Sequence, residues 1–141
     1  MRGFEMSRFE TKVLIRETHL DLFGHVNNAT YMQIFEDARW DYITKNGYGI
    51  PQILLYKKGP VMLECQIRFL KELHARDEIT VTLEQVFTES KAHQKVFKLR
   101  QQMINAQGEV ACEATYSYGL FDTQIRRLIE PTPEWKIAMG I

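Results

Sequence analysis

The sequence predicts an α+β fold in which one long helix packs against a five-stranded antiparallel sheet. Three observations support this prediction. Apolar residues between 28 and 45 recur with the spacing of an amphipathic helix, four later segments alternate apolar and polar residues, and the connections between those segments are short. A chain of 141 residues can bury a core of its own, so we expect residues 1–141 to form a single domain.

The composition excludes several function classes. The 18 Lys and Arg residues balance the 18 Asp and Glu residues, so no overall positive charge attracts nucleic acid or an anionic membrane. The first residues lack the apolar region of a signal peptide, and no apolar run approaches the length of a membrane span. We therefore expect a cytoplasmic protein. Cys65 and Cys112 form no C-x-x-C pair and are expected to be buried thiols.

The first predicted elements are a strand and a helix. Residues 9–16, "FETKVLIR", are short, partly alternating and partly β-branched, which favours a strand. The helix is predicted for residues 28–45, with either Asn27 or Asn28 capping its start and the glycines of "NGYG" at 46–49 suited to its end. Its apolar face contains Tyr31, Ile34, Phe35, Ala38 and Tyr42.

The remaining strands are predicted in the second half of the chain, at residues 61–70, 78–86, 93–104 and 109–121. In the first of them, alternation places Val61, Leu63, Cys65, Ile67 and Phe69 on one face. Short connections predict an antiparallel meander, in which each strand pairs with the next. Because the other face of so small a sheet is only partly polar, we expect the chain to form a homodimer or homotetramer.

A polar loop, "HLDLFGHVNNATY", precedes the predicted helix. The first turn of a helix presents unpaired backbone N–H groups and about half a positive charge. Asp21 lies seven residues before Asn28, so its carboxylate can face the same point as these amides, and Gly24 allows a tight turn or a close approach to a ligand. This arrangement pairs a base or nucleophile with an oxyanion site.

The segment "HLDLFGHVNNATYMQIFEDAR" resembles the D-x-x-G-H-V-N-N-x-x-Y signature of hotdog-fold acyl-CoA thioesterases of the 4-hydroxybenzoyl-CoA thioesterase type. The predicted order of elements is similar to that family, and the ending "FDTQIRRLIEPTPEW" resembles its last strand, closing turn and short terminal helix. The resemblance implies a hotdog fold and hydrolysis of an acyl-CoA to a free acid and coenzyme A. We expect neither a cofactor nor a metal.

The resemblance also implies roles for individual residues. Asp21 takes the place of the catalytic carboxylate, and the backbone N–H of Asn28 takes the place of the amide that polarises the thioester carbonyl. Asp21 would act as a general base on water or as a nucleophile, and the sequence leaves both routes open. The residues expected to bind substrate are Gly24, His25, Asn27, Tyr31, Phe35 and Lys91, with Tyr31 and Phe35 lining the acyl pocket and Lys91 near the nucleotide.

Several alternatives remain at this point. Glu36 is a second candidate carboxylate, because a related class of thioesterases uses a carboxylate on the helix. His19, Asp21 and His25 are residue types that bind zinc or iron, but the loop supplies no further ligand, so no metal site is predicted. The chain could instead be an acyl-ACP thioesterase, a hydratase-like enzyme on the same scaffold, or a protein that binds acyl thioesters without cleaving them.

Overall fold

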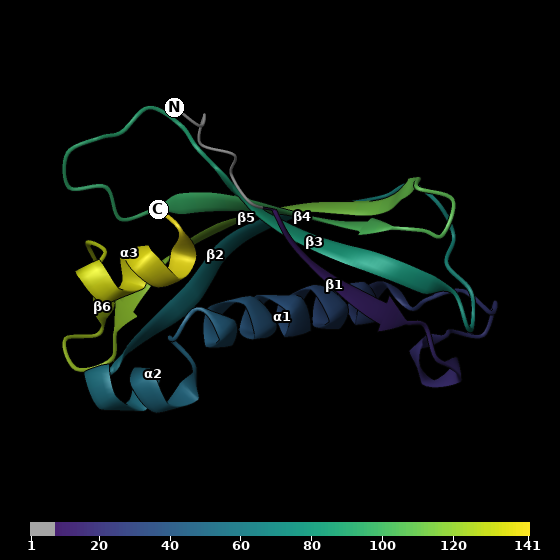
Figure 1. The fold of residues 1–141 in the computed structure, drawn as a ribbon, viewed down its shortest axis with the longest axis horizontal. Coiled ribbons are helices and arrows are strands. Elements are labelled where there is room, and N and C mark those ends of the chain that lie inside the picture. The colour runs from purple at the N-terminus through teal and green to yellow at the C-terminus, as the bar shows by residue number, and fades with distance from the viewer. Residues whose placement is uncertain (1–7) are drawn as a thin grey trace.

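The computed structural model describes residues 8–141 and confirms the predicted α+β class. The strands form one antiparallel sheet, and the long helix α1 lies against one of its faces (Figure 1). In chain order the elements are β1 (Phe9–Leu14), the short 3-10 helix η1 (Glu17–His19), α1 (Asn28–Lys45), α2 (Ile50–Tyr56), β2 (Lys58–Phe69), β3 (Glu78–Val86), β4 (Phe97–Ile104), β5 (Val110–Asp122), β6 (Arg127–Ile129) and α3 (Pro133–Met139).

Within residues 8–141 the sheet has six strands, so the prediction of five is wrong by one. Its order is β1-β3-β4-β5-β2, with the short β6 also pairing with β5. The predicted meander is confirmed for β3, β4 and β5. It is wrong for β2, which pairs with β5 instead of β3 and therefore lies at an edge. Alternation along a strand identifies its two faces but carries no information about its neighbour, which is why the sequence did not reveal this position.

A β-bulge interrupts β2 at Leu63. Met62 pairs with Tyr118 and Glu64 pairs with Ser117, the next residue along β5, so Leu63 has no partner in β5. Met62 and Cys65 both pack against the core, on the two sides of the bulge, whereas Leu63 is exposed. The prediction that Leu63 shares a face with Cys65 is therefore wrong, because one extra residue breaks the alternation.

Helix α1 begins and ends at the predicted residues. Of the two candidate caps, Asn27 is the one that acts, because its side-chain Oδ1 accepts the backbone N–H of Ala29 at 2.9 Å. The predicted apolar face is buried at Tyr31, Ile34, Phe35 and Ala38. Burying a large apolar side chain contributes about 1.5–3 kcal/mol, so this face is what holds the helix on the sheet.

Helix α2 was not predicted from the sequence. None of its residues is buried, although Ile53 packs against the core. Helix α3 is anchored by Trp135, which is fully buried and packs edge-on against Tyr48 with ring centroids 5.1 Å apart. Thr132 caps α3 by accepting the backbone N–H of Trp135 at 3.3 Å. Within residues 8–141, no helix combines the length and the apolar character that crossing a membrane requires.

Candidate functional site

Asp21 sits in a tight turn that its own side chain helps to close. Its Oδ1 accepts the backbone N–H of Phe23 at 2.8 Å and that of His25 at 3.2 Å. The backbone N–H of Asp21 donates to the carbonyl of His25 at 2.8 Å, and Gly24 adopts a φ of +77° that few other residues tolerate. The second oxygen, Oδ2, has no hydrogen bond to any residue between 8 and 141 and is left to act on a ligand.

The first turn of α1 leaves one backbone amide without an acceptor. The side chain of Asn27 takes the N–H of Ala29, and the carbonyl of Asn27 accepts the N–H groups of Thr30 at 2.9 Å and Tyr31 at 3.3 Å. In the part of the chain that the structure describes, the N–H of Asn28 donates to no acceptor. An amide at the positive end of a helix is suited to bind a carbonyl oxygen that gains negative charge.

Asp21 and Asn28 line one pocket of about 540 Å³. Three more predicted residues, His25, Asn27 and Tyr31, line it as well. The structure adds lining residues that the sequence did not reveal, which are Val26, Phe69, Leu70, Lys71 and Glu72. Most of these come from the end of β2 and the loop after it. These residues reach the pocket because that loop pairs with the Asp21 turn. Alternation along a strand does not indicate such a contact between distant segments, so the sequence did not reveal it.

Tyr31 keeps its proton throughout the physiological pH range. Its side chain is buried and packs edge-on against Phe69, with ring centroids 5.0 Å apart. Burial, with smaller contributions from Cys112 and from the carboxylates of Asp21 and Glu72, raises the pKa of Tyr31 to about 12. The phenol on this wall of the pocket is therefore a neutral hydroxyl that can donate a hydrogen bond.

The pocket also has charged side chains at its edge. The Lys71 ammonium lies 3.0 Å from a carboxylate oxygen of Glu109, and both side chains are about half exposed. His25 Nε2 lies 3.3 Å from Glu72 Oε2 on the loop after β2. Lys71 is therefore a cation within reach of an anionic ligand in this pocket.

Three predicted substrate-binding residues do not line this pocket. Gly24 shapes the turn without lining it. Phe35 is fully buried in the core, where its ring packs edge-on against Tyr116 with centroids 6.4 Å apart. Lys91 lines a separate pocket with His93 and Glu130, and the β3–β4 loop that carries it lies at the opposite end of the sheet from the Asp21 turn (Figure 1).

The three residues considered as metal ligands from the sequence, which are His19, Asp21 and His25, do not form a cluster. The Nδ1 atom of His19 accepts the backbone N–H of Arg16 at 2.9 Å, and its side chain lines a different pocket from Asp21. His25 instead lies close to Glu72 and to His74. The histidine of the motif thus faces the β2–β3 loop.

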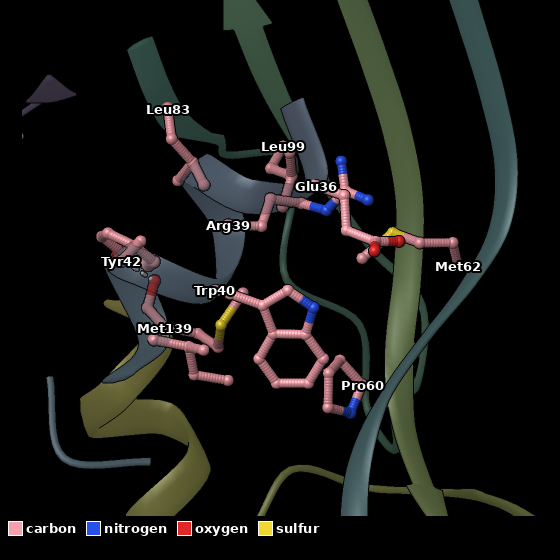
Figure 2. A pocket seen from close by; sticks show the side chains of 10 residues that line it. Glu36, Arg39, Trp40, Tyr42, Pro60, Met62, Leu83, Leu99 and Met139 are labelled. Atoms are coloured by element: carbon pink, nitrogen blue, oxygen red, sulfur yellow. Dashed lines mark hydrogen bonds between the residues drawn. The ribbon is translucent and has the colours of Figure 1, made fainter. Parts of the chain in front are cut away.

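Glu36, the alternative carboxylate, lies at a second and more apolar pocket of about 110 Å³ between α1 and the sheet. Figure 2 shows Trp40, Pro60 and Met139 around one part of this pocket and the charged Glu36 and Arg39 at its other edge. Arg39 is held in place there, because its Nη1 donates to Gln101 Oε1 at 3.0 Å and its guanidinium lies 4.2 Å from the centroid of the Tyr116 ring. Glu36 thus belongs to a different surface from the Asp21 turn.

Comparison with known proteins identifies the family and the relatives that this chain resembles. Residues 15–138 match the family described as the thioesterase-like superfamily. The chain is 25% identical to the long-chain acyl-CoA thioesterase FadM of Escherichia coli (strain K12) over 122 residues, which cover 85% of this chain and 88% of that protein.

Two solved structures show the same fold. A hypothetical protein of Staphylococcus aureus, determined in complex with CoA, has a TM-score of 0.87 and 18% identity and covers 99% of this chain and 86% of its own. A 1,4-dihydroxy-2-naphthoyl-CoA thioesterase from Synechocystis has a TM-score of 0.81 and 16% identity, with coverage of 95% and 96% respectively. These likenesses confirm the predicted hotdog fold.

Proposed function

Since the chain belongs to the thioesterase-like superfamily and is a thioester hydrolase, we propose that it cleaves acyl-CoA thioesters to a free acid and coenzyme A. The observation that carries this proposal is that Asp21 and Asn28 line the same pocket, while Asp21 Oδ2 and the N–H of Asn28 have no hydrogen-bond partner within residues 8–141. The CoA thioesterases among its relatives support CoA as the carrier. The local signature supports placement with the 4-hydroxybenzoyl-CoA type.

The proposed reaction uses few groups. The thioester carbonyl oxygen accepts the N–H of Asn28, which stabilises the negative charge that develops as the carbonyl is attacked. In one route Asp21 takes a proton from water as the water oxygen bonds to the carbonyl carbon. The carbon–sulfur bond then breaks, and the thiolate of CoA leaves and receives that proton. In the other route the carboxylate itself displaces the thiolate, and water hydrolyses the mixed anhydride.

Two further side chains are assigned to substrate binding within this proposal. The protonated hydroxyl of Tyr31 donates a hydrogen bond inside the pocket. Lys71 contacts a phosphate of CoA, because Lys71 lines the pocket and Lys91 does not. The resemblance in sequence implied this role for Lys91.

The test of the activity is a panel of acyl-CoAs with detection of the released thiol, run beside acyl-ACPs that carry the same acyl groups. We expect the protein to release thiol from at least one acyl-CoA and to do so faster than from the matched acyl-ACP. Faster release from the ACP would make the protein an acyl-ACP thioesterase. Tight binding of every acyl-CoA without thiol release would show that it binds thioesters without cleaving them.

The free edge of β2 supports a homodimer. In residues 8–141 this strand pairs with β5 alone, and its other edge has no partner. The strand and the residue after it expose Leu63, Phe69 and Leu70, and the last two also line the site pocket. We propose that two chains join at this edge and that the second chain completes the pocket wall.

The dimer is tested by substituting the exposed residue of the bulge. Leu63→Glu places a charge at the proposed interface, and we expect light scattering to give half the molar mass of the wild type, because burying an unpaired carboxylate is costly. Leu54→Glu is the matched control, since Leu54 is exposed on α2 and does not belong to β2. A wild-type chain that is monomeric, or a Leu63→Glu variant of unchanged mass, would contradict an interface at β2.

A further inference from the structure

Three side chains with metal-binding groups meet beside the site pocket. His25 comes from the turn before α1, and Glu72 and His74 come from the loop between β2 and β3. One ligand atom from each lies within 4.8 Å of the other two. Glu72 Oε2 is the central atom, 3.3 Å from His25 Nε2 and 3.5 Å from His74 Nε2.

The two distances from Glu72 match the spacing of ligand atoms around a tetrahedral metal ion. With metal–ligand bonds of about 2.0–2.2 Å, a tetrahedral zinc ion separates its ligand atoms by about 3.3–3.6 Å. Both separations from Glu72 fall in that interval. Two imidazoles and one carboxylate form a ligand set that zinc uses where a fourth position is kept for water.

The backbone around the cluster holds its ligands in place. The N–H of Val26 donates to the carbonyl of Leu73 at 3.3 Å, which ties the turn to the loop between the two loop ligands. Leu73 itself is fully buried, so the loop is anchored at that point. The backbone N–H of His74 donates to Asp77 Oδ2 at 2.8 Å.

Asp77 also lies behind one of the ligands. The Nδ1 atom of His74 is 3.8 Å from Asp77 Oδ2, on the side of the ring opposite the nitrogen that faces Glu72. At this distance the carboxylate makes no hydrogen bond to the ring, but its negative charge favours a positive ion bound at the other nitrogen.

We propose that His25, Glu72 and His74 bind one divalent transition-metal ion, with zinc preferred by the ligand set, at the edge of the site pocket. His25 and Glu72 also line that pocket, so the ion would lie where it can influence ligands that enter. The inference stands apart from thioester hydrolysis, because metal binding can be measured without any substrate.

The experiment is a calorimetric titration of the untagged, chelator-treated chain with zinc chloride, followed by the visible absorption of bound cobalt(II). We expect one ion per chain and a cobalt spectrum typical of tetrahedral coordination. His74→Gln should weaken zinc binding by about tenfold or more, because loss of a direct ligand costs at least as much as loss of an outer partner.

His93→Gln is the matched control. His93 is an exposed histidine that also lies beside a carboxylate, with its Nδ1 3.0 Å from Glu130 Oε1, but it lies outside the cluster. We expect this variant to bind zinc as the wild type does. Absence of saturable binding to the wild type, or equal affinity in wild type and His74→Gln, would overturn the proposal. Thermal melting verifies that both variants remain folded.

Discussion

Replacing Asp21 by Asn is expected to lower kcat for acyl-CoA hydrolysis by about two powers of ten or more, with the melting temperature unchanged. An asparagine keeps an oxygen that accepts the N–H groups of Phe23 and His25, so the turn can persist. The amide can neither take a proton from water nor attack a carbonyl carbon. The chemical step should therefore fail in a site that is still formed.

The measurement is steady-state thiol release together with a thermal melt for each variant. Glu36→Gln is the matched control, because Glu36 is the other candidate carboxylate and lines the separate pocket of Figure 2. It is expected to retain the wild-type kcat. If Asp21→Asn were active and Glu36→Gln inactive, the catalytic carboxylate would be the one on the helix and the assignment of Asp21 would fail.

Replacing Phe35 by Ala is expected to lower the free energy of unfolding by about 3–5 kcal/mol. Phe35 is fully buried between α1 and the sheet, and its ring packs against that of Tyr116. Its backbone carbonyl accepts Gln101 Nε2 at 3.0 Å, which fixes the helix over β4 at the same point. Removing the ring therefore leaves a cavity that a helix held in this way cannot close.

Urea denaturation of the wild type and the variant measures this loss. Phe87→Ala is the matched control, since Phe87 is exposed beyond the end of β3, and it should change the free energy by less than about 0.5 kcal/mol. A Phe35→Ala variant of wild-type stability that hydrolysed a different range of acyl chains would contradict its place in the core. That result would support the role in the acyl pocket that the sequence resemblance implied for Phe35.

The sequence predicted α1 well because the helix is determined by its own residues. The spacing of Tyr31, Ile34, Phe35 and Ala38 lies within a single segment, and these residues form the buried face of the helix as predicted. Its cap, Asn27, is one of the two candidates in the same segment. The Asp21 turn is local in the same way. Its side chain bonds to amides two and four residues ahead, so the motif and the geometry coincide.

Features that depend on distant segments were not predicted. The edge position of β2 depends on its pairing with β5, and the far wall of the site pocket depends on that pairing too. Glu72 and His74 approach His25 where Val26 bonds to Leu73 across the two loops. Helical spacing alone also does not distinguish a residue that faces a ligand from one that faces the sheet, so the packing of Phe35 against Tyr116 was not predicted.

The unpaired Leu63 also determines where β2 can change its length in evolution. Because Met62 and Glu64 pair with neighbouring residues of β5, a homologue that lacks position 63 would keep every other side chain of the strand on its present face. Loss of Met62 or Glu64 would also remove the bulge, because Leu63 would take the vacant place opposite Tyr118 or Ser117. Loss of a residue outside the bulge would instead turn the residues between it and the bulge onto the opposite face. Deletions in this strand should therefore accumulate at positions 62–64.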